Sequence, residues 1–173
     1  MDLHQTIFEL IDMRSFSNLW FWIALAVMWS TASHWVMGVP FDMIVRAKKY
    51  EGQAELDLQD IVRVNVNRLL YIGHVSGLWM LGFGCFVLSA LALLGFVYEV
   101  EFAQAVFLLA LPMAILFGLS LRTAHAIAFA NPQGEVLRAK LLRHRLYTQF
   151  LGVLSIFTTA LWGMYQNLSF GAL

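Results

Sequence analysis

Charge is distributed very unevenly along this chain. Ten of its eleven Lys and Arg residues lie in two stretches, Arg46–Arg68 and Arg122–Arg145. Four runs without Lys, Arg, Asp or Glu lie around them, at about 18–39, 69–98, 102–121 and 146–168. A helix needs about 20 such residues to cross the roughly 30 Å hydrocarbon core of a membrane. The sequence therefore predicts an all-α integral membrane protein, folded as a four-transmembrane-helix bundle.

Composition sets further limits. Hydrophobic residues make up 60% of the chain and the mean hydropathy is +0.70, which excludes a water-soluble globule. Four spans and two sizeable loops leave a single membrane domain over 1–173. A formal net charge of zero, with no basic face, argues against nucleic acid as a partner. Cys85 is the only cysteine, so an internal disulfide is excluded and a thiolate metal site is not expected.

Orientation follows from the positive-inside rule. The connections at Arg46–Arg68 and Arg122–Arg145 are basic, whereas the middle connection holds only Glu99 and Glu101. In a bacterial inner membrane, we therefore expect both basic connections in the cytoplasm and both chain ends in the periplasm.

The first residues differ from the four runs because they alternate in polarity. Over 2–14, apolar and polar residues fall on opposite faces of a helix, which predicts an amphipathic helix lying on the outer membrane surface. Its acidic polar face leaves docking on lipid and docking on a partner protein equally open. The apolar face consists of Leu3, Ile7, Leu10 and Ile11.

Turn and capping residues predict where several helices begin and end. Lys48–Gly52 is typical of a turn. Asp57 and Asp60 resemble a capping box, and a helix beginning there has no breaker before the second span. Asn131–Gly134 predicts a strong turn, with a new helix starting at Glu135 and continuing as the fourth span.

Small residues indicate where helices can approach closely in lipid. Two faces carry them, and both internal packing and an intermolecular interface would use such faces. They are Gly73, Gly77 and Gly84 on the second span, and Ser155, Thr159 and Gly163 on the fourth.

Polar groups near the membrane are candidates for chemistry, because burying them is costly. His34 and His74 lie on different spans at similar depth, and a b-type haem needs two such axial ligands. The alternative is that each imidazole bonds a neighbouring helix. Arginines at the span ends form either a snorkelling collar that sets topology or an anion site. These arginines are Arg63, Arg68, Arg122, Arg143 and Arg145.

The segment from Arg63 to Tyr71 carries a more specific pattern. Arg63, Asn67 and Tyr71 recur at four-residue spacing and so share one helix face. The segment resembles the Arg-x-x-x-Asn-x-x-Glu-Tyr pattern of the MAPEG family, four-span proteins that include membrane glutathione transferases and leukotriene synthases. In that family the Arg and Asn help to hold glutathione between subunits, so the resemblance implies a glutathione site at these three residues. Where the family has Glu, this chain has Leu70.

A second resemblance covers more of the chain. The run from Thr6 to Met43 and the segment VNVNRLLYI at 64–72 resemble a family of small alphaproteobacterial membrane proteins. Its members are often labelled as a component of the Suf (SufBCD) iron–sulfur assembly complex. Because one cysteine cannot carry a cluster, the resemblance implies tethering of soluble partners by the basic cytoplasmic loops.

Three functional hypotheses follow. No catalytic motif of high specificity is present and no catalytic residue is predicted, so the leading prediction is a non-catalytic accessory or scaffold subunit of a bacterial inner-membrane assembly. Its partners would be membrane lipid and other membrane subunits, or further copies of itself. The alternatives are a MAPEG-like enzyme that uses glutathione and a membrane protein that binds haem b through His34 and His74.

Overall fold

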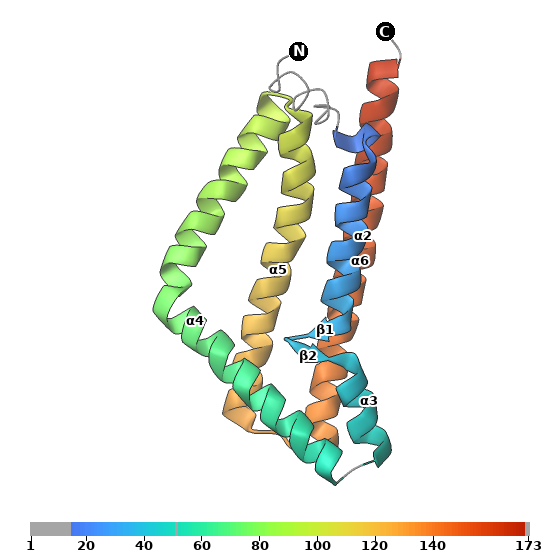
Figure 1. Ribbon diagram of the computed structural model, residues 1–173. Helices are drawn as coiled ribbons and strands as arrows, with labels where there is room; N and C mark the ends of the chain where they lie inside the picture. The colour runs from blue at the N-terminus through green and yellow to red at the C-terminus, as the bar shows by residue number, and fades with distance from the viewer. Residues whose placement is uncertain (1–14, 51, 172–173) are drawn as a thin grey trace, which may run out of the picture.

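The computed structural model describes residues 15–50 and 52–171 and places most of them in helices (Figure 1). The predicted all-α class is confirmed. A 3₁₀ turn, η1, precedes the first long helix, α2, and a two-stranded hairpin follows that helix. A π-helical turn, η2, follows α4. The elements are η1 (Ser15–Ser17), α2 (Leu19–His34), β1 (Trp35–Val36), β2 (Val39–Pro40), α3 (Phe41–Tyr50), α4 (Gln53–Ala92), η2 (Leu93–Val97), α5 (Glu101–Ala130) and α6 (Gly134–Gly171).

Within residues 15–50 and 52–171, three helices are long and apolar enough to cross a membrane: α4 continued by η2, α5 and α6. The first predicted span, 18–39, is wrong at its end, because α2 stops at His34 after 16 residues, which is about 24 Å. Met37 and Gly38 have φ angles of 54° and 79° and turn the chain between β1 and β2. A helix cannot continue through this turn. The helix expected at 2–14 lies outside the described residues.

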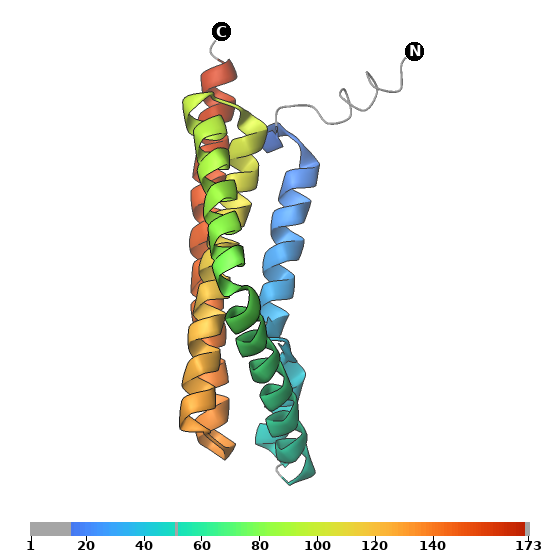
Figure 2. The ribbon, with the colours of Figure 1, turned by 90° about the vertical axis from the view of Figure 1, so that its left-hand side faces the viewer.

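The basic residues gather at one end of the molecule. Every Lys and Arg between Arg46 and Arg145 belongs to α3, the first half of α4, the end of α5 or the start of α6. These segments lie together at the bottom of Figure 1, whereas η1, the α4–α5 connection and the end of α6 lie at the top. Figures 1 and 2 also show that α4 bends about midway, so its two halves run in different directions.

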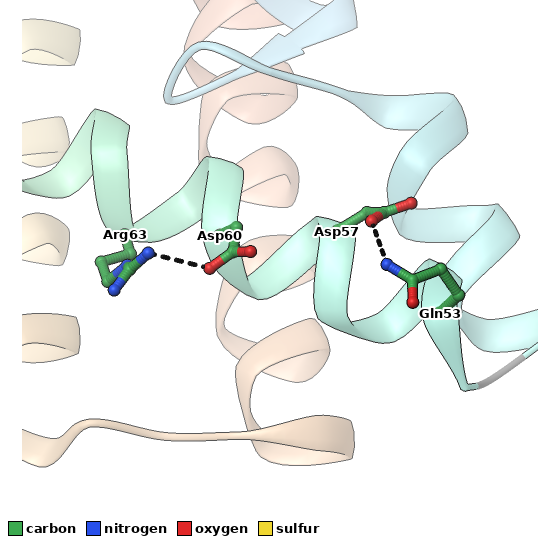
Figure 3. Close-up of polar contacts among 4 residues, drawn as sticks. All are labelled: Gln53, Asp57, Asp60 and Arg63. Carbon is green, nitrogen blue, oxygen red and sulfur yellow. Dashed lines mark hydrogen bonds and ion pairs between the residues drawn. The ribbon is translucent and has the colours of Figure 1, made fainter.

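The start of α4 differs from the predicted one. The helix begins at Gln53, after Gly52 with a φ of 55°, and not at the predicted Asp57. Figure 3 shows what Asp57 and Asp60 bind: the Gln53 amide donates to Asp57 Oδ1 across 2.8 Å, and Arg63 donates to Asp60 Oδ1 across 3.0 Å. Both carboxylates thus bind side chains of their own helix and cap no backbone group.

Two other boundaries test the turn predictions. The turn before α6 is confirmed: α5 ends at Ala130, Asn131 is left-handed with a φ of 40°, and α6 begins at Gly134. The turn expected from Lys48 is wrong in its first part, because α3 runs to Tyr50. Burial of Ile44 and Ala47 on one face holds α3 in helical form.

The largest hydrophobic cluster lies at the basic end and not between the apolar runs. It joins the hairpin, α3, the first half of α4, the end of α5 and the start of α6, so the polar half of α4 is packed and does not project alone. Its buried members are Val36, Met37, Val39, Ile44, Ala47, Leu58, Val62, Val66, Ala124, Ile127, Leu137 and Leu141.

The opposite end is held by polar contacts around Gln104, which is 2% exposed. Its Nε2 donates to the carbonyl of Gly95 in η2 across 2.7 Å, and its Oε1 accepts from Trp162 Nε1 across 3.0 Å. Gln166 Nε2 donates to the same oxygen across 2.6 Å. One side chain of α5 therefore joins the end of α4 to α6.

Candidate functional site

Arg63 and Asn67 line a common cavity of about 450 Å³ between α4 and the α5–α6 turn. Their four-residue spacing on α4 directs both side chains to this side of the helix, and the turn residues Asn131 and Gln133 close the opposite wall. Both α4 side chains are exposed, so the cavity is open to solvent. The structure thus brings together two of the three residues predicted from the Arg63–Tyr71 pattern.

Tyr71 does not join them. Its side chain is 69% exposed and it does not line the cavity that Arg63 and Asn67 share. Arg63 itself is already paired with Asp60, at 3.0 Å, with both side chains 71% exposed. A pair exposed to this degree contributes little, so Asp60 would be a weak competitor for an incoming anion.

A second cavity, of about 360 Å³, lies where the hairpin, α4, α5 and α6 meet. His144 lines it with Ser120 and is 3% exposed. The hydroxyl oxygens of Ser120 and Thr123 lie 3.4 and 3.1 Å from its Nε2 and Nδ1. Both hydroxyls also donate to the carbonyl four residues earlier, and a neutral imidazole has one N–H, so the ring donates to one of the two hydroxyls according to its tautomer. His144 thus holds α6 against α5.

Sequence patterns singled out His34 and His74 and not His144, although the place of His144 on α6 carries a signal. Every third or fourth residue of α6 from Leu137 onward is buried, and His144 falls in that series. A period close to 3.6 from a hydrophobic residue identifies the inner face of a helix. The series is Leu137, Leu141, His144, Thr148, Gly152, Ser155, Thr159 and Gly163.

The two histidines considered as haem ligands are both exposed. His34 ends α2, and its ring meets that of Trp35 edge-on, with centroids 5.8 Å apart. His74 lies on α4, and neither imidazole lines the cavity around His144. Haem binding by this pair stays a prediction, which the visible spectrum of the purified protein tests.

The described part of the chain contains no group of three or more His, Cys, Asp or Glu side chains placed to hold a metal ion. Comparison with known proteins adds no identity: no family model, no curated protein and no solved structure matches the chain.

Proposed function

We propose that this protein is a non-catalytic accessory subunit that packs against a larger inner-membrane assembly through the second half of α4 (73–92). The observation that carries the proposal is the open space beside two glycines of that segment. A Cβ atom added to Gly73 would lie 3.2 Å from Leu121 Cδ2, so this glycine is packed against α5. The same atom on Gly77 or Gly84 would meet nothing within 4 Å in the described part of the chain.

The three glycines lie on nearly the same side of α4, so their different surroundings can be compared directly. Gly77 and Gly84 follow Gly73 by four and eleven residues, which puts all three on nearly the same face at about 3.6 residues per turn. That face packs internally at one end and is vacant along the rest. Small residues let two helix backbones approach closely, which is the main source of helix association in lipid. A vacant glycine face therefore suits a helix from another subunit.

The small residues of α6 behave differently. A Cβ on Gly152 would lie 2.8 Å from the Trp29 ring, and one on Gly163 would lie 3.4 Å from Phe16 and Trp22. Ser155 is also buried. This face is filled by α2 and η1, so α6 uses its small residues inside the subunit.

The large exposed apolar side chains of this segment lie on the other side of α4, around Gly82. Leu78 is 86% exposed and Trp79 is 84% exposed, and Phe83 and Phe86 are 70% exposed. They do not line the recess beside Gly77 and Gly84, so the vacant glycine face itself supports the proposal.

The test is the native mass and subunit composition of the tagged protein, extracted from its own membranes in a gentle detergent. We expect a larger hetero-assembly, and mass spectrometry of its subunits will show whether Suf proteins are among them. Gly77→Leu combined with Gly84→Leu should release the partner by filling the recess. Gly82→Leu is the matched control, because Gly82 is on the opposite side of the helix and also has open space. A wild-type protein without partner subunits would overturn the proposal, as would retention of the partner by the double variant.

A glutathione-dependent, MAPEG-like enzyme is the second candidate, favoured by the cavity that Arg63 and Asn67 share. The same native-mass measurement would then give a homotrimer. Glutathione should bind, and Asn67→Ala should abolish binding while the protein stays folded and inserted. Asn65→Ala offers a control on the same helix, because Asn65 does not line this cavity. Unchanged binding in Asn67→Ala would exclude the cavity as the glutathione site.

We also propose four spans, with α2 as the shortest and both chain ends in the periplasm. The arrangement supports this: α2 lies alongside α6, and the basic segments gather at the opposite end from η1 and the end of α6 (Figure 1). Alkaline phosphatase fused after α6 should be active, and phosphatase inserted at Gln133 should be inactive. The reverse pattern would disprove the orientation.

Deleting 2–14 should release a docked partner without loss of insertion.

A further inference from the structure

A cavity of about 560 Å³ opens between the end of α5 and the start of α6, separate from the surface of α4 discussed above. Arg122 and Thr123 line it from α5, and Lys140, Arg143 and Tyr147 line it from α6. The two helices run antiparallel on either side of the Asn131 turn. The lining residues of α5 and those of α6 therefore lie at the same height along the helix pair. Among the residues that the structure describes, no Asp or Glu lines this cavity.

Its cations lack carboxylate partners within residues 15–50 and 52–171. The two ion pairs present there join Arg63 to Asp60 and Arg138 to Glu55. Lys140 donates only to the carbonyl of Ala126, across 3.1 Å. Like charges gathered without counter-ions repel one another, so an anion bound among them would be stabilised.

An apolar groove of about 160 Å³ continues from this cavity along the same two helices. On α5, Leu108, Leu111 and Ile115 line the groove at the three- and four-residue spacing that leads on to Arg122. On α6, Leu151 and Leu154 continue the spacing from Arg143 in the opposite direction along the chain. The cation-lined cavity and the apolar groove therefore form one continuous strip on the outer surface of α5 and α6.

The length of the apolar part fits one leaflet. From Leu108 to the level of Leu119, which lines the cationic cavity, a helix rises about 16 Å. This is roughly half of the 30 Å hydrocarbon core. Free phosphate would use the cations alone, whereas a phospholipid would use both the cations and the groove.

We infer that this strip binds an anionic phospholipid. Its phosphate lies among Arg122, Lys140 and Arg143, and one acyl chain lies along Leu108–Leu119. The phenol of Tyr147 can donate to a phosphate or glycerol oxygen. Basic pockets between membrane helices bind anionic headgroups in this way, and Arg presents a fork of donors that matches phosphate geometry.

The experiment is native mass spectrometry of the purified protein in maltoside detergent with equal amounts of phosphatidylglycerol and phosphatidylcholine of the same chains. We expect phosphatidylglycerol adducts to dominate. Arg122→Gln with Arg143→Gln should lower that preference by roughly 25-fold, at about fivefold per cation. Arg46→Gln is the matched control, because Arg46 is an exposed arginine of the same basic end outside this cavity. An unchanged preference in the double variant would overturn the inference.

Two further arms separate the lipid from a free anion. Ile115→Trp fills the apolar groove without touching a charge, so it should weaken phosphatidylglycerol binding even if the arginine double variant fails to fold. Millimolar inorganic phosphate should not displace the lipid. Displacement by phosphate, or full lipid binding by Ile115→Trp, would show a free-anion site and exclude the lipid.

Discussion

The guanidinium of Arg145 lies over the ring of Phe41, with Cζ 3.7 Å from the ring centroid. Its Nε also donates to the carbonyl of Ser33 across 3.2 Å. One side chain of α6 thus contacts both α3 and the end of α2. The arginines at the basic end therefore differ in role: Arg145 joins three helices, whereas Arg122 and Arg143 line an open cavity.

Replacing Arg145 by Ala should destabilise the protein in detergent by about 1–3 kcal/mol, because a cation–π contact and a hydrogen bond are lost together. Thermal unfolding followed by tryptophan fluorescence measures the change. Arg143→Ala removes the same charge two positions earlier from an exposed site and should be nearly neutral. Equal effects of the two substitutions would show that the Phe41 and Ser33 contacts do not matter.

Replacing Gln104 by Leu should cost about 2–4 kcal/mol, because Gly95 O and Trp162 Nε1 would lose their partner at a buried position. The unfolding midpoint in detergent should fall accordingly. Gln53→Leu serves as the control, since its bond to Asp57 is exposed and contributes only a few tenths of a kcal/mol. A wild-type midpoint in Gln104→Leu would contradict the role of Gln104 as the link between η2 and α6.

Replacing Gly152 by Ala should destabilise the α2–α6 contact by about 1–3 kcal/mol, because the new Cβ would lie 2.8 Å from Trp29 and force the ring to move. The environment of Trp29 should change, which tryptophan fluorescence reports. Gly118→Ala introduces the same atom on α5 where nothing lies within 4 Å. It should be neutral or stabilising by up to about 1 kcal/mol, and a similar loss in both variants would argue against tight α2–α6 packing.

Replacing Asn65 by Ala should loosen the β1–β2 hairpin, because Nδ2 donates to the carbonyl of Gly38 across 3.1 Å. We expect a loss of about 0.5–1.5 kcal/mol and faster amide hydrogen exchange over residues 35–40. Asn67→Ala removes an amide two residues later that makes no contact with the hairpin turn in the described part of the chain. Exchange rates that stay at wild-type values in Asn65→Ala would show that the hairpin holds its shape alone.

Some features of the fold could be predicted from the sequence, and others could not. The turn at Asn131 and the continuity of α4 into its apolar half were predictable, because turn residues and the lack of breakers act locally. The end of α2 was not, because the apolar run continues to Val39 and only the turn at Met37 and Gly38 interrupts it. Arg63 and Asn67 share a cavity and Tyr71 lies outside it, and binding of a ligand by these residues stays a prediction.

The sequence by itself determined the class of the protein and the placement of its charge, because hydropathy and charge are properties of each residue and need no knowledge of neighbours. Only the tertiary structure decided which small residues are packed against a neighbour and which polar residues have a contact partner. Gly152 is filled by Trp29 while Gly77 is vacant, and Arg145 lies on Phe41 while Arg143 has no such partner. These differences depend on how the helices pack against one another. Two residues of the same type are identical in the sequence, so the sequence does not show which of them is packed.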